Sequence, residues 1–449
     1  MSGLHYLPLT DEERKEMLQV MGVASVEELF SDIPDEVRFS GDMDLPQPLV
    51  EHEAYNHLRR LASQNYNLED YPCFLGAGVY DHLIPATVKH VLNRSEFYTS
   101  YTPYQAEVSQ GILQAIFEYQ TLICRLTGME AANASMYDGA TAVAEAAVMS
   151  CNVTRRNKVL VSRSVHPAYR RVLQTYFDAR DFKLEEIDIK DGFLNAEEVE
   201  ARVDQETAAL VVQNPNFLGM LESYEGLAEC LHGKGALMVA VVDPISLALV
   251  KSPAEYGADI VAGEGQSLGN PPSYGGPLLG FFAAREKFIR RMPGRISGQT
   301  VDAAGNRGFV MTMQTREQHI RRGRATSNIC TNQALNALAA TVYLATLGPQ
   351  GLQEVAKGCL QKTAYARDKI AALPGYQIAF PGNYFKEFPV VLPGSPEELN
   401  SYLLEKGIIG GLDLGRDYSE LDYAMLFCFT EKRTVEEIDG LVHALEGWK

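Results

Sequence analysis

Residues 259–277 read Asp259-Ile-Val-Ala-Gly-Glu-Gly-Gln-Ser-Leu-Gly-Asn-Pro-Pro-Ser-Tyr-Gly-Gly-Pro277. The stretch begins with a short apolar run and continues into a loop rich in Gly and Pro. An apolar run of this length bounded by turn residues is typical of a strand that is buried on both faces. The loop holds no lysine, since none occurs between Lys251 and Lys287. It can therefore offer a ligand amides and backbone groups, but no amine.

Four more apolar runs lie before and after this stretch, with amphipathic helical patterns between them. They are Lys158-Val-Leu-Val161, Ala208-Ala-Leu-Val-Val212, Leu237-Met-Val-Ala-Val-Val242 and Leu278-Leu-Gly-Phe-Phe282. Buried strands that alternate with helices are typical of a mostly parallel α/β sheet. We therefore expect one large α/β domain over residues 66–330.

The two ends of the chain follow different patterns. At the N-terminus, the capping motifs Thr10-Asp-Glu-Glu13 and Ser25-Val-Glu-Glu28 predict short helices. We interpret residues 1–65 as a helical arm. Towards the C-terminus, a long helix rich in Ala and Leu is predicted to start after Asn332 and to stop near Gly348-Pro349. It would link the large domain to a smaller α+β domain, and the two together make up residues 331–449.

The composition indicates a folded protein with more than one domain. The chain has 449 residues, of which 46% are hydrophobic and 22% are charged. A net charge of −18 would repel the phosphates of nucleic acids. The seven cysteines are scattered, which fits reduced thiols, and no apolar run is long enough to span a membrane. We expect a cytoplasmic protein that binds neither nucleic acid nor membrane, and no metal site is predicted.

Small and polar residues follow several predicted strands, which is where ligands bind in open α/β sheets. Gly139 and Thr141 begin a helix of small residues and could hold an anion through backbone N–H groups. His166, Asn214 and Asp243 each follow an apolar run. Taken singly, every one of these residues has a simpler interpretation as a helix cap, a structural histidine or a turn residue.

The order of these residues resembles that of fold type I enzymes, which use pyridoxal phosphate (PLP). The resemblance implies a phosphate-binding turn at Gly139 and Thr141, and a cofactor ring stacked on His166. It also implies that Asn214 contacts the phenolic oxygen and that Asp243 pairs with the protonated ring nitrogen. The implied fold has a large domain with a mostly parallel sheet of the seven-stranded type and a smaller α+β C-terminal domain.

Four longer segments carry a closer resemblance. They are Tyr101-Thr-Pro-Tyr-Gln-Ala-Glu-Val-Ser-Gln-Gly111, Met292-Pro-Gly-Arg295, Gln314-Thr-Arg-Glu-Gln-His-Ile-Arg-Arg322 and Ala325-Thr-Ser-Asn-Ile-Cys-Thr331. These segments are similar to the glycine cleavage system P-protein family, glycine dehydrogenase (decarboxylating). The similarity is to its N-terminal half, which in many bacteria is a separate chain called subunit 1 or the α subunit. It covers nearly all of the sequence.

The resemblance implies that the covalent cofactor bond belongs to another chain. In this family, subunit 2 carries a lysine in a loop that continues into a Pro and a Gly-rich turn. Aligning that loop on Pro271 and on Gly275-Gly-Pro277 places Gln266 at the lysine, and an amide cannot form an imine with PLP. The isolated chain would be inactive. Together with subunit 2 it would decarboxylate glycine and pass the aminomethyl group to the lipoyl arm of the H-protein, most simply as an α2β2 assembly.

Two segments are candidates for side chains that enter the pocket of the partner. The first is the tyrosine-rich loop Tyr98–Glu107, whose rings and hydroxyls suit binding and acid–base chemistry. The second is the arginine-rich segment Arg316–Ser327, which suits a carboxylate. The candidate residues are Tyr101, Tyr104, Glu107, Arg324, Thr326 and Ser327. Interface packing is the alternative for the first segment, and a solvated basic surface is the alternative for the second.

Two other functions remain open from the sequence. A self-sufficient PLP enzyme would need a lysine elsewhere, for instance Lys234 or Lys251. A non-catalytic scaffold would stabilise a partner without entering its active site. The scaffold differs from the preferred hypothesis in one observable, because substitutions at Tyr101, Tyr104 or Arg324 would leave turnover of the complex unchanged.

Overall fold

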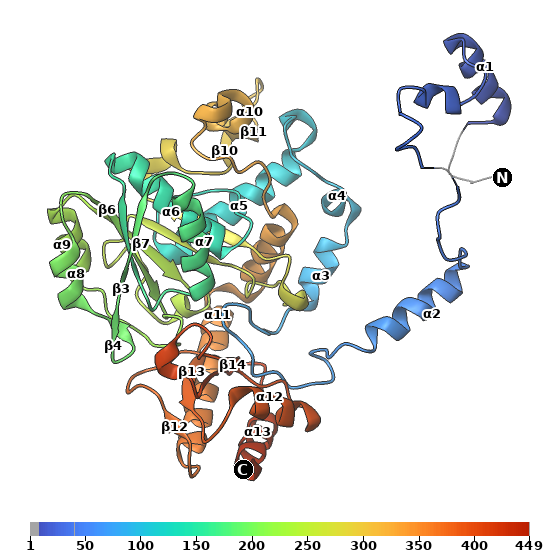
Figure 1. Cartoon of the computed structure of the whole chain (residues 1–449). Helices are drawn as coiled ribbons and strands as arrows, with labels where there is room; N and C mark the ends of the chain where they lie inside the picture. The colour runs from blue at the N-terminus through green and yellow to red at the C-terminus, as the bar shows by residue number, and fades with distance from the viewer. Residues whose placement is uncertain (1–8, 40, 449) are drawn as a thin grey trace. The chain divides into compact units, whose positions relative to one another are not determined.

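The polypeptide falls into two units in the computed structural model, which describes residues 9–39 and 41–448. One unit runs up to Asn65 and the other runs from Tyr66 to the C-terminus. Figure 1 shows the chain coloured along its length. The three-part division expected from the sequence stays a prediction.

The first unit consists of short helices joined by irregular segments. They are α1 (Asp11–Met21), the 3₁₀ turn η1 (Glu27–Phe30) and α2 (Glu51–Ala62). The capping box predicted for α1 is present, because the Thr10 hydroxyl accepts from the Glu13 N–H and the Glu13 carboxylate accepts from the Thr10 N–H. None of the described residues of this unit is buried. Its many apolar side chains therefore have no core of their own.

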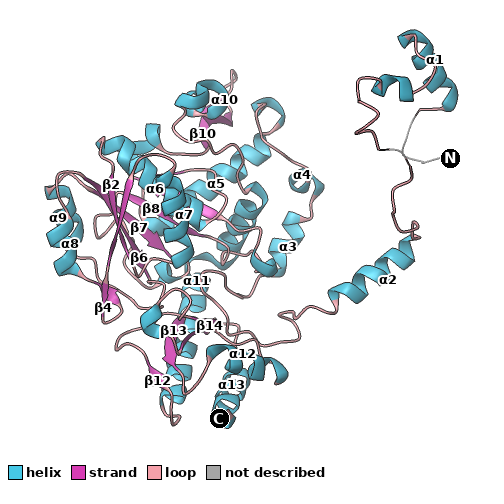
Figure 2. Ribbon diagram, in the orientation of Figure 1, coloured by secondary structure: helices cyan, strands magenta, loops and turns pink. Residues whose placement is uncertain are grey.

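A seven-stranded sheet forms the centre of the second unit. Figure 2 shows strands of this sheet among the helices. Its order is β1 (Ala131–Ala132), β9 (Gly280–Ala284), β8 (Ile260–Glu264), β7 (Leu237–Val242), β6 (Thr207–Asn214), β2 (Lys158–Ser162) and β3 (Lys183–Ile187). All neighbours pair in parallel except β9, which is antiparallel to both β8 and β1. The predicted mostly parallel sheet is confirmed, and the five apolar runs supply five of its strands.

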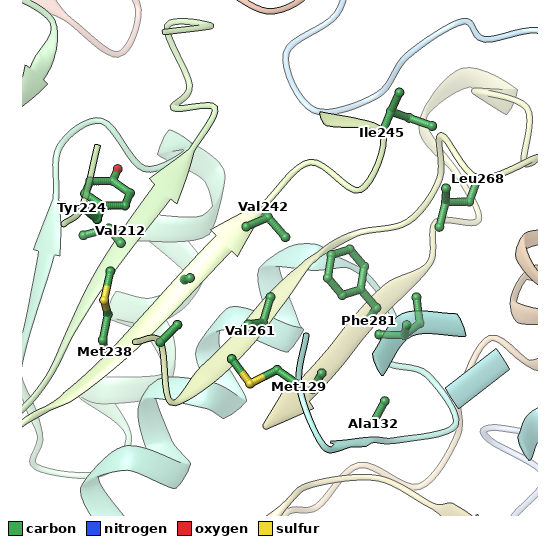
Figure 3. Packing of buried hydrophobic residues seen from close by; sticks show 14 of the residues in the cluster. Met129, Ala132, Val212, Tyr224, Met238, Val242, Ile245, Val261, Leu268 and Phe281 are labelled. Carbon is green, nitrogen blue, oxygen red and sulfur yellow. The ribbon is translucent and has the colours of Figure 1, made fainter. Parts of the chain in front are cut away.

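Both faces of this sheet are covered, which explains the continuous apolar runs. Along β7, Val239 and Val241 pack in one cluster with α6 (Gly139–Thr154) and α7 (Pro167–Asp178). Met238 and Val242 point to the opposite face and pack with α5 (Gln110–Thr127), α9 (Leu227–Gly233) and α11. Figure 3 shows this second cluster. Full burial of one Val or Leu side chain contributes about 1.5–3 kcal/mol relative to exposure, so both layers stabilise the sheet.

The helix α11 (Ala334–Ala371) connects the main sheet to the C-terminal lobe. The sequence predicts that this helix stops near Gly348-Pro349, and this is only half right. Gly348 leaves the helical conformation, with φ 60° and ψ −176°, but the helix resumes at once and continues to Ala371. Proline is well placed at the first position of a new helical segment, because the N–H that it lacks would have no partner there.

The C-terminal lobe is a four-stranded antiparallel sheet with two helices. Its order is β12 (Gln377–Ile378), β13 (Glu387–Val391), β15 (Ala424–Cys428) and β14 (Leu412–Asp413), and its helices are α12 (Pro396–Glu405) and α13 (Val435–Gly447). These elements match the expected α+β pattern. No helix in the described part of the chain combines the length and the apolar character needed to cross a bilayer.

Several smaller elements were not expected from the sequence. They are α3 (Ala86–Leu92), α4 (Ser95–Tyr98), the pair β4 (Ile189–Lys190) and β5 (Phe193–Leu194), α8 (Ala196–Arg202), α10 (Gln318–Arg321) and a hairpin of β10 (Ile296–Val301) and β11 (Arg307–Thr312). The hairpin is tied to the start of α5, where the Gln110 amide bonds both the N–H and the C=O of Phe309 at 2.8 Å. It flanks the tyrosine-rich loop.

Candidate functional site

The carboxyl ends of β6, β7 and β8 form one edge of the main sheet, as the order of the candidate residues suggested. Asn214 pairs in register with Val242, so Asp243 follows at the same edge. A small pocket lies here, with a volume of about 40 Å³. We call it the strand-end pocket, and among its lining residues are His166, Tyr169, Asp243, Glu264, Lys386 and Glu387.

Asp243 has its charge partner within the chain. Its Oδ2 lies 2.5 Å from the Nζ of Lys386, and its Oδ1 accepts from the N–H groups of Ile245 and Ser246 at 2.9 and 3.2 Å. The Lys386 side chain comes from the C-terminal lobe, and its Nζ also lies 3.4 Å from the ring centroid of Tyr80. Burial opposes the ammonium charge, but the adjacent carboxylate raises the pKa of Lys386 above its ordinary value.

His166 is half-buried, and both of its ring nitrogens are engaged. Its Nδ1 accepts from the Ala168 N–H at 3.0 Å, and its Nε2 donates to the Ala77 carbonyl at 2.9 Å. The ring of Tyr169 stacks on it with centroids 4.6 Å apart and planes at 11°, and Phe217 approaches at 4.7 Å. Burial lowers the pKa of His166 to about 4, so the imidazole is neutral at pH 7.

The N-terminus of α6 is occupied by carboxylates. The Asp138 side chain caps the helix by accepting from the Thr141 N–H at 2.7 Å, and the Thr141 hydroxyl bonds the same carboxylate at 2.8 Å. The Gly139 N–H donates to Glu264 Oε2 at 2.9 Å. Gly139 and Thr141 thus lie at the start of a helix, as expected, but their N–H groups donate to side-chain carboxyls of the same chain.

The side chains of Gln266 and Asn214 form hydrogen bonds with the backbone of the same chain. The Gln266 side chain is fully buried, and its amide accepts from the Tyr80 N–H at 2.8 Å and donates to the carbonyls of Tyr80 and Asn270 at 3.0 and 2.6 Å. The amide of Asn214 bonds the N–H and the C=O of Glu222 at 3.1 and 3.0 Å. These two amides hold neighbouring backbone segments together, and neither lines the strand-end pocket.

Sequence reasoning missed the residues that fill the pocket. Tyr169 follows His166 by three positions in α7, so the helical spacing could have indicated a ring on the same face. Glu264 ends strand β8, so the strand-end position that singled out Asp243 could also have indicated Glu264. Lys386 carries no such signal, because contacts between distant segments place it. Lys234 and Lys251, considered as alternative cofactor lysines, are exposed and do not line the pocket.

The tyrosine-rich loop lies on the surface of the second unit. The exposed fraction of Tyr101 is 79% and that of Tyr104 is 53%, and Glu107 is also exposed. The guanidinium of Arg295 holds Tyr104 in place, with Nη2 3.3 Å from the tyrosine hydroxyl and the charge 5.6 Å from the ring centroid. The same Nη2 donates to the Cys330 carbonyl at 2.6 Å. Arg295 therefore brings the two candidate segments side by side.

The arginine-rich segment divides into buried and exposed side chains. Arg316 donates to the carbonyls of Met292 and Gly294, the latter at 2.9 Å, and burial lowers the pKa of its guanidinium. Ser327 is buried, and its hydroxyl accepts from a backbone N–H two residues on. Arg324 is exposed and Thr326 is half-buried. Of the second candidate set, Arg324 is the side chain best placed to reach another molecule.

Residues 4–445 match the sequence profile of the glycine cleavage system P-protein. The chain belongs to the P-protein family. It is 55% identical to a probable glycine dehydrogenase (decarboxylating) subunit 1 of Desulforamulus reducens, over 98% of this chain and 99% of the relative. A protein of the same description from Carboxydothermus hydrogenoformans is 54% identical, over 99% of this chain and all of the relative.

Solved structures place this P-protein chain in a known fold. It aligns with the crystal structure of glycine decarboxylase (P-protein) of the glycine cleavage system in inhibitor-bound form, with a TM-score of 0.92, 47% identity and coverage of 98% and 99% of the two chains. A sphingosine-1-phosphate lyase of Burkholderia pseudomallei aligns with a TM-score of 0.67 at 15% identity over 92% and 93% of the two chains, which shows the fold alone. The expected fold type I architecture of PLP-dependent enzymes is confirmed.

The residues at the strand-end pocket of this P-protein chain do not fit PLP. Asp243, the residue expected to pair with the ring nitrogen, is already paired with Lys386, and the ring of Tyr169 lies parallel to His166 where a cofactor ring would stack. A phosphate at the start of α6 would face the carboxylates of Asp138 and Glu264. We therefore derive no cofactor chemistry at this pocket.

Glu387 gives the pocket a pH dependence that can be measured. Burial raises the pKa of this carboxyl from about 4.5 to about 7, against the opposing effect of the Ala77 N–H that donates to it at 2.5 Å. Between these two values the folded chain binds more protons than the unfolded chain, so the stability contributed by this group falls as the pH rises.

Replacing Glu387 with Gln removes this dependence. The amide oxygen can still accept from Ala77, and the amide N–H can donate to the Tyr80 hydroxyl, which now lies 2.8 Å from Glu387 Oε2. Relative to the natural chain, the variant should gain on the order of 2–3 kcal/mol of unfolding free energy between pH 4.5 and pH 8. Urea unfolding at a series of pH values measures this, and a difference that does not change with pH would contradict it.

Proposed function

We propose that the chain is subunit 1 of a two-subunit P-protein and that it completes an active site whose lysine belongs to subunit 2. The observation that carries the proposal is the loop at Gln266, where a buried amide with three hydrogen bonds stands at the position aligned with the partner's lysine. No amine from this loop can reach a cofactor. The relatives described as subunit 1 support a second chain.

The proposed reaction is the decarboxylation of glycine, with transfer of the aminomethyl group to the lipoyl arm of the H-protein. PLP, held by subunit 2, supplies the electron sink for the loss of the carboxylate. This chain provides the exposed polar side chains near the tyrosine-rich loop. Arg324 would bind a carboxylate through its guanidinium fork, and Tyr101 would position or move a proton at its hydroxyl.

The first experiment separates the chain from its partner. The purified chain, given PLP, glycine and lipoylated H-protein, should release no labelled CO2 from carboxyl-labelled glycine. Addition of subunit 2 should restore the release. Turnover by this chain alone would contradict the proposal, and so would full turnover by subunit 2 alone.

The second experiment distinguishes a contributed side chain from a mere scaffold. Tyr101→Phe and Arg324→Gln should each lower turnover of the assembled enzyme by about tenfold or more, because a lost proton-transfer group or charged hydrogen bond acts on the reacting atoms. Tyr423→Phe and Arg416→Gln are matched controls, since both residues are exposed on the C-terminal lobe. Unchanged turnover in both test variants, with assembly intact, would favour the scaffold.

A further inference from the structure

We propose that the strand-end pocket is a former cofactor site, in which the chain's own side chains take the places of the charged ring nitrogen, the phosphate and the ring of a pyridoxal phosphate. The same side chains then fasten the C-terminal lobe to the main sheet. This inference stands on the geometry of the pocket and does not depend on the role proposed for the assembled enzyme.

The positive charge in the pocket comes from Lys386. In a fold type I site, an Asp at the end of a central strand pairs with the protonated ring nitrogen. Here Asp243 Oδ2 lies 2.5 Å from the Lys386 ammonium, and the exposed fractions of the two side chains are 11% and 3%. A buried charge without a partner is costly, so each of these two groups needs the other. An incoming ring nitrogen would have to displace the ammonium.

The acceptor at the start of α6 is Glu264, a carboxyl whose pKa is raised by burial to about 7. The start of an α-helix attracts anions through its unpaired N–H groups and its dipole. In the sixteen-residue α6, two of these groups are already used, because Gly139 donates to Glu264 and Thr141 donates to Asp138. The other Glu264 oxygen accepts from the N–H groups of Gln266 and Leu279 at 2.9 and 2.7 Å. A phosphate would meet two carboxylates instead of free donors.

The space of the ring is filled by Tyr169. Its ring lies parallel to His166, and its hydroxyl points at the start of α6, where a Cβ added to Gly139 would come within 2.4 Å of it. The aromatic ring and its polar tip thus run from the histidine to the helix terminus. The roughly 40 Å³ left beside these side chains can hold a few water molecules.

These side chains join parts of the chain that are far apart in sequence. Lys386 and Glu387 stand at the start of β13 in the C-terminal lobe. Lys386 reaches Asp243 at the end of β7, and Glu387 accepts from Tyr80 and from the Ala77 N–H. The segment 77–80 therefore lies between the lobe and the main sheet, bonded on one side by Glu387 and on the other by Gln266. Charges that would hold a ligand instead hold the two parts together.

The first test measures ligand exclusion in the natural full-length chain. Pyridoxine 5′-phosphate is a suitable probe, because it has the ring and the phosphate of the cofactor but no aldehyde that could react with surface lysines. Titration calorimetry should show no saturable binding at millimolar concentrations. Saturable binding of one molecule per chain would overturn the proposal. The exception is binding that inorganic phosphate displaces and that a Glu264→Ala variant shows equally well. Such binding would identify an anion site elsewhere on the surface and would leave the exclusion intact.

The second test measures fastening by a double-mutant cycle at the Lys386–Asp243 pair. Lys386→Met and Asp243→Asn should each lower the Tm by several degrees, because each leaves a buried charge unpaired, and the double variant should lose less than the sum of the two. Lys251→Met is the matched control, since that lysine pairs with Glu225 on the surface and its loss should leave the Tm almost unchanged.

Each outcome of this double-mutant cycle either supports or contradicts the fastening role of the Lys386–Asp243 pair. A single variant that does not fold counts as the expected loss if the double variant folds. Additive losses, a Lys386→Met effect no larger than that of Lys251→Met, or a double variant that does not fold would overturn the fastening role. The exclusion of the probe by the natural chain is read out independently of all these variants.

Discussion

Replacing Arg295 with Met is expected to lower turnover of the assembled enzyme by about 10²-fold or more, since small displacements of positioning groups have effects of this size. Arg295 is a positioning residue in the proposed function. Its guanidinium contacts Tyr104 in one candidate segment and the Cys330 carbonyl beside the other. Without these contacts, the edge-to-face approach of Tyr104 and His319, with ring centroids 6.0 Å apart, still joins the two segments, but their relative position is less restricted. The loss should appear mainly in kcat, with subunit assembly unchanged.

The same replacement should also destabilise the chain. Glu317 Oε2 lies 3.7 Å from Arg295 Nε, and the exposed fractions of the two side chains are 12% and 11%. Removal of the guanidinium leaves this carboxylate facing the imidazole of His319, whose Nδ1 lies 3.6 Å from the same oxygen; where that imidazole is neutral, the loss of the charged partner costs about 3–5 kcal/mol. Urea unfolding measures this loss.

Two further variants distinguish the effect of Arg295 on the position of the two segments from the effect of its charge on stability. Arg295→Lys keeps the charge but loses the planar fork, so it should retain most of the stability and little of the turnover. Arg295→Met combined with Glu317→Gln should recover stability and leave turnover low. Recovery of both quantities together would show that Arg295 acts only on stability and would contradict the positioning role.

Replacing Gly219 with Ala is expected to destabilise the chain by about 4 kcal/mol, close to the upper end for a single substitution. Gly219 has a φ of 79°, and a Cβ there would lie 2.0 Å from the Glu387 carbonyl oxygen. The backbone cannot retreat easily, because the Gly219 carbonyl accepts from the Phe385 N–H at 3.0 Å. Overpacking against backbone atoms adds to the strain of a left-handed alanine.

Gly407 provides a control for the conformational part of this effect. Its φ is 77°, nearly the same as that of Gly219, but no atom lies within 4 Å of an added Cβ. Gly407→Ala should therefore cost only about 1–2 kcal/mol, the strain of the left-handed conformation alone. The difference between the two variants, measured by urea unfolding, reports the contact between the turn at Gly219 and β13. Equal losses would show that this contact is not tight.

The strands of the main sheet could be predicted because a strand that is buried on both faces needs apolar residues at every position, which gives a continuous apolar run in the sequence. The run at 237–242 is an example, since every residue in it is buried. The hairpin of β10 and β11 was missed for the converse reason. Its strands carry polar and apolar residues in a mixed pattern, and four residues of β10 lie partly or fully exposed. Such a pattern fits a surface loop equally well.

The sequence predicted where the candidate site residues lie on the sheet, but not which side chains they contact. Asp243, His166 and Gly139 lie at the edge where the order of strands placed them, because strand ends are determined by local apolar runs. Their actual partners could not be predicted. Lys386 reaches Asp243 only after the C-terminal lobe has docked on the main sheet, and no local pattern around Lys386 indicates this contact.

The pairing of Lys386 with Asp243 has a consequence for how such a gene can change over generations. A mutation that removes either charge alone leaves the other unpaired in the interior, and we expect selection against such a change. The two codons can then diverge only together, although a large part of the open reading frame separates them. One ion pair in the interior thus links the evolution of two distant positions in the sequence.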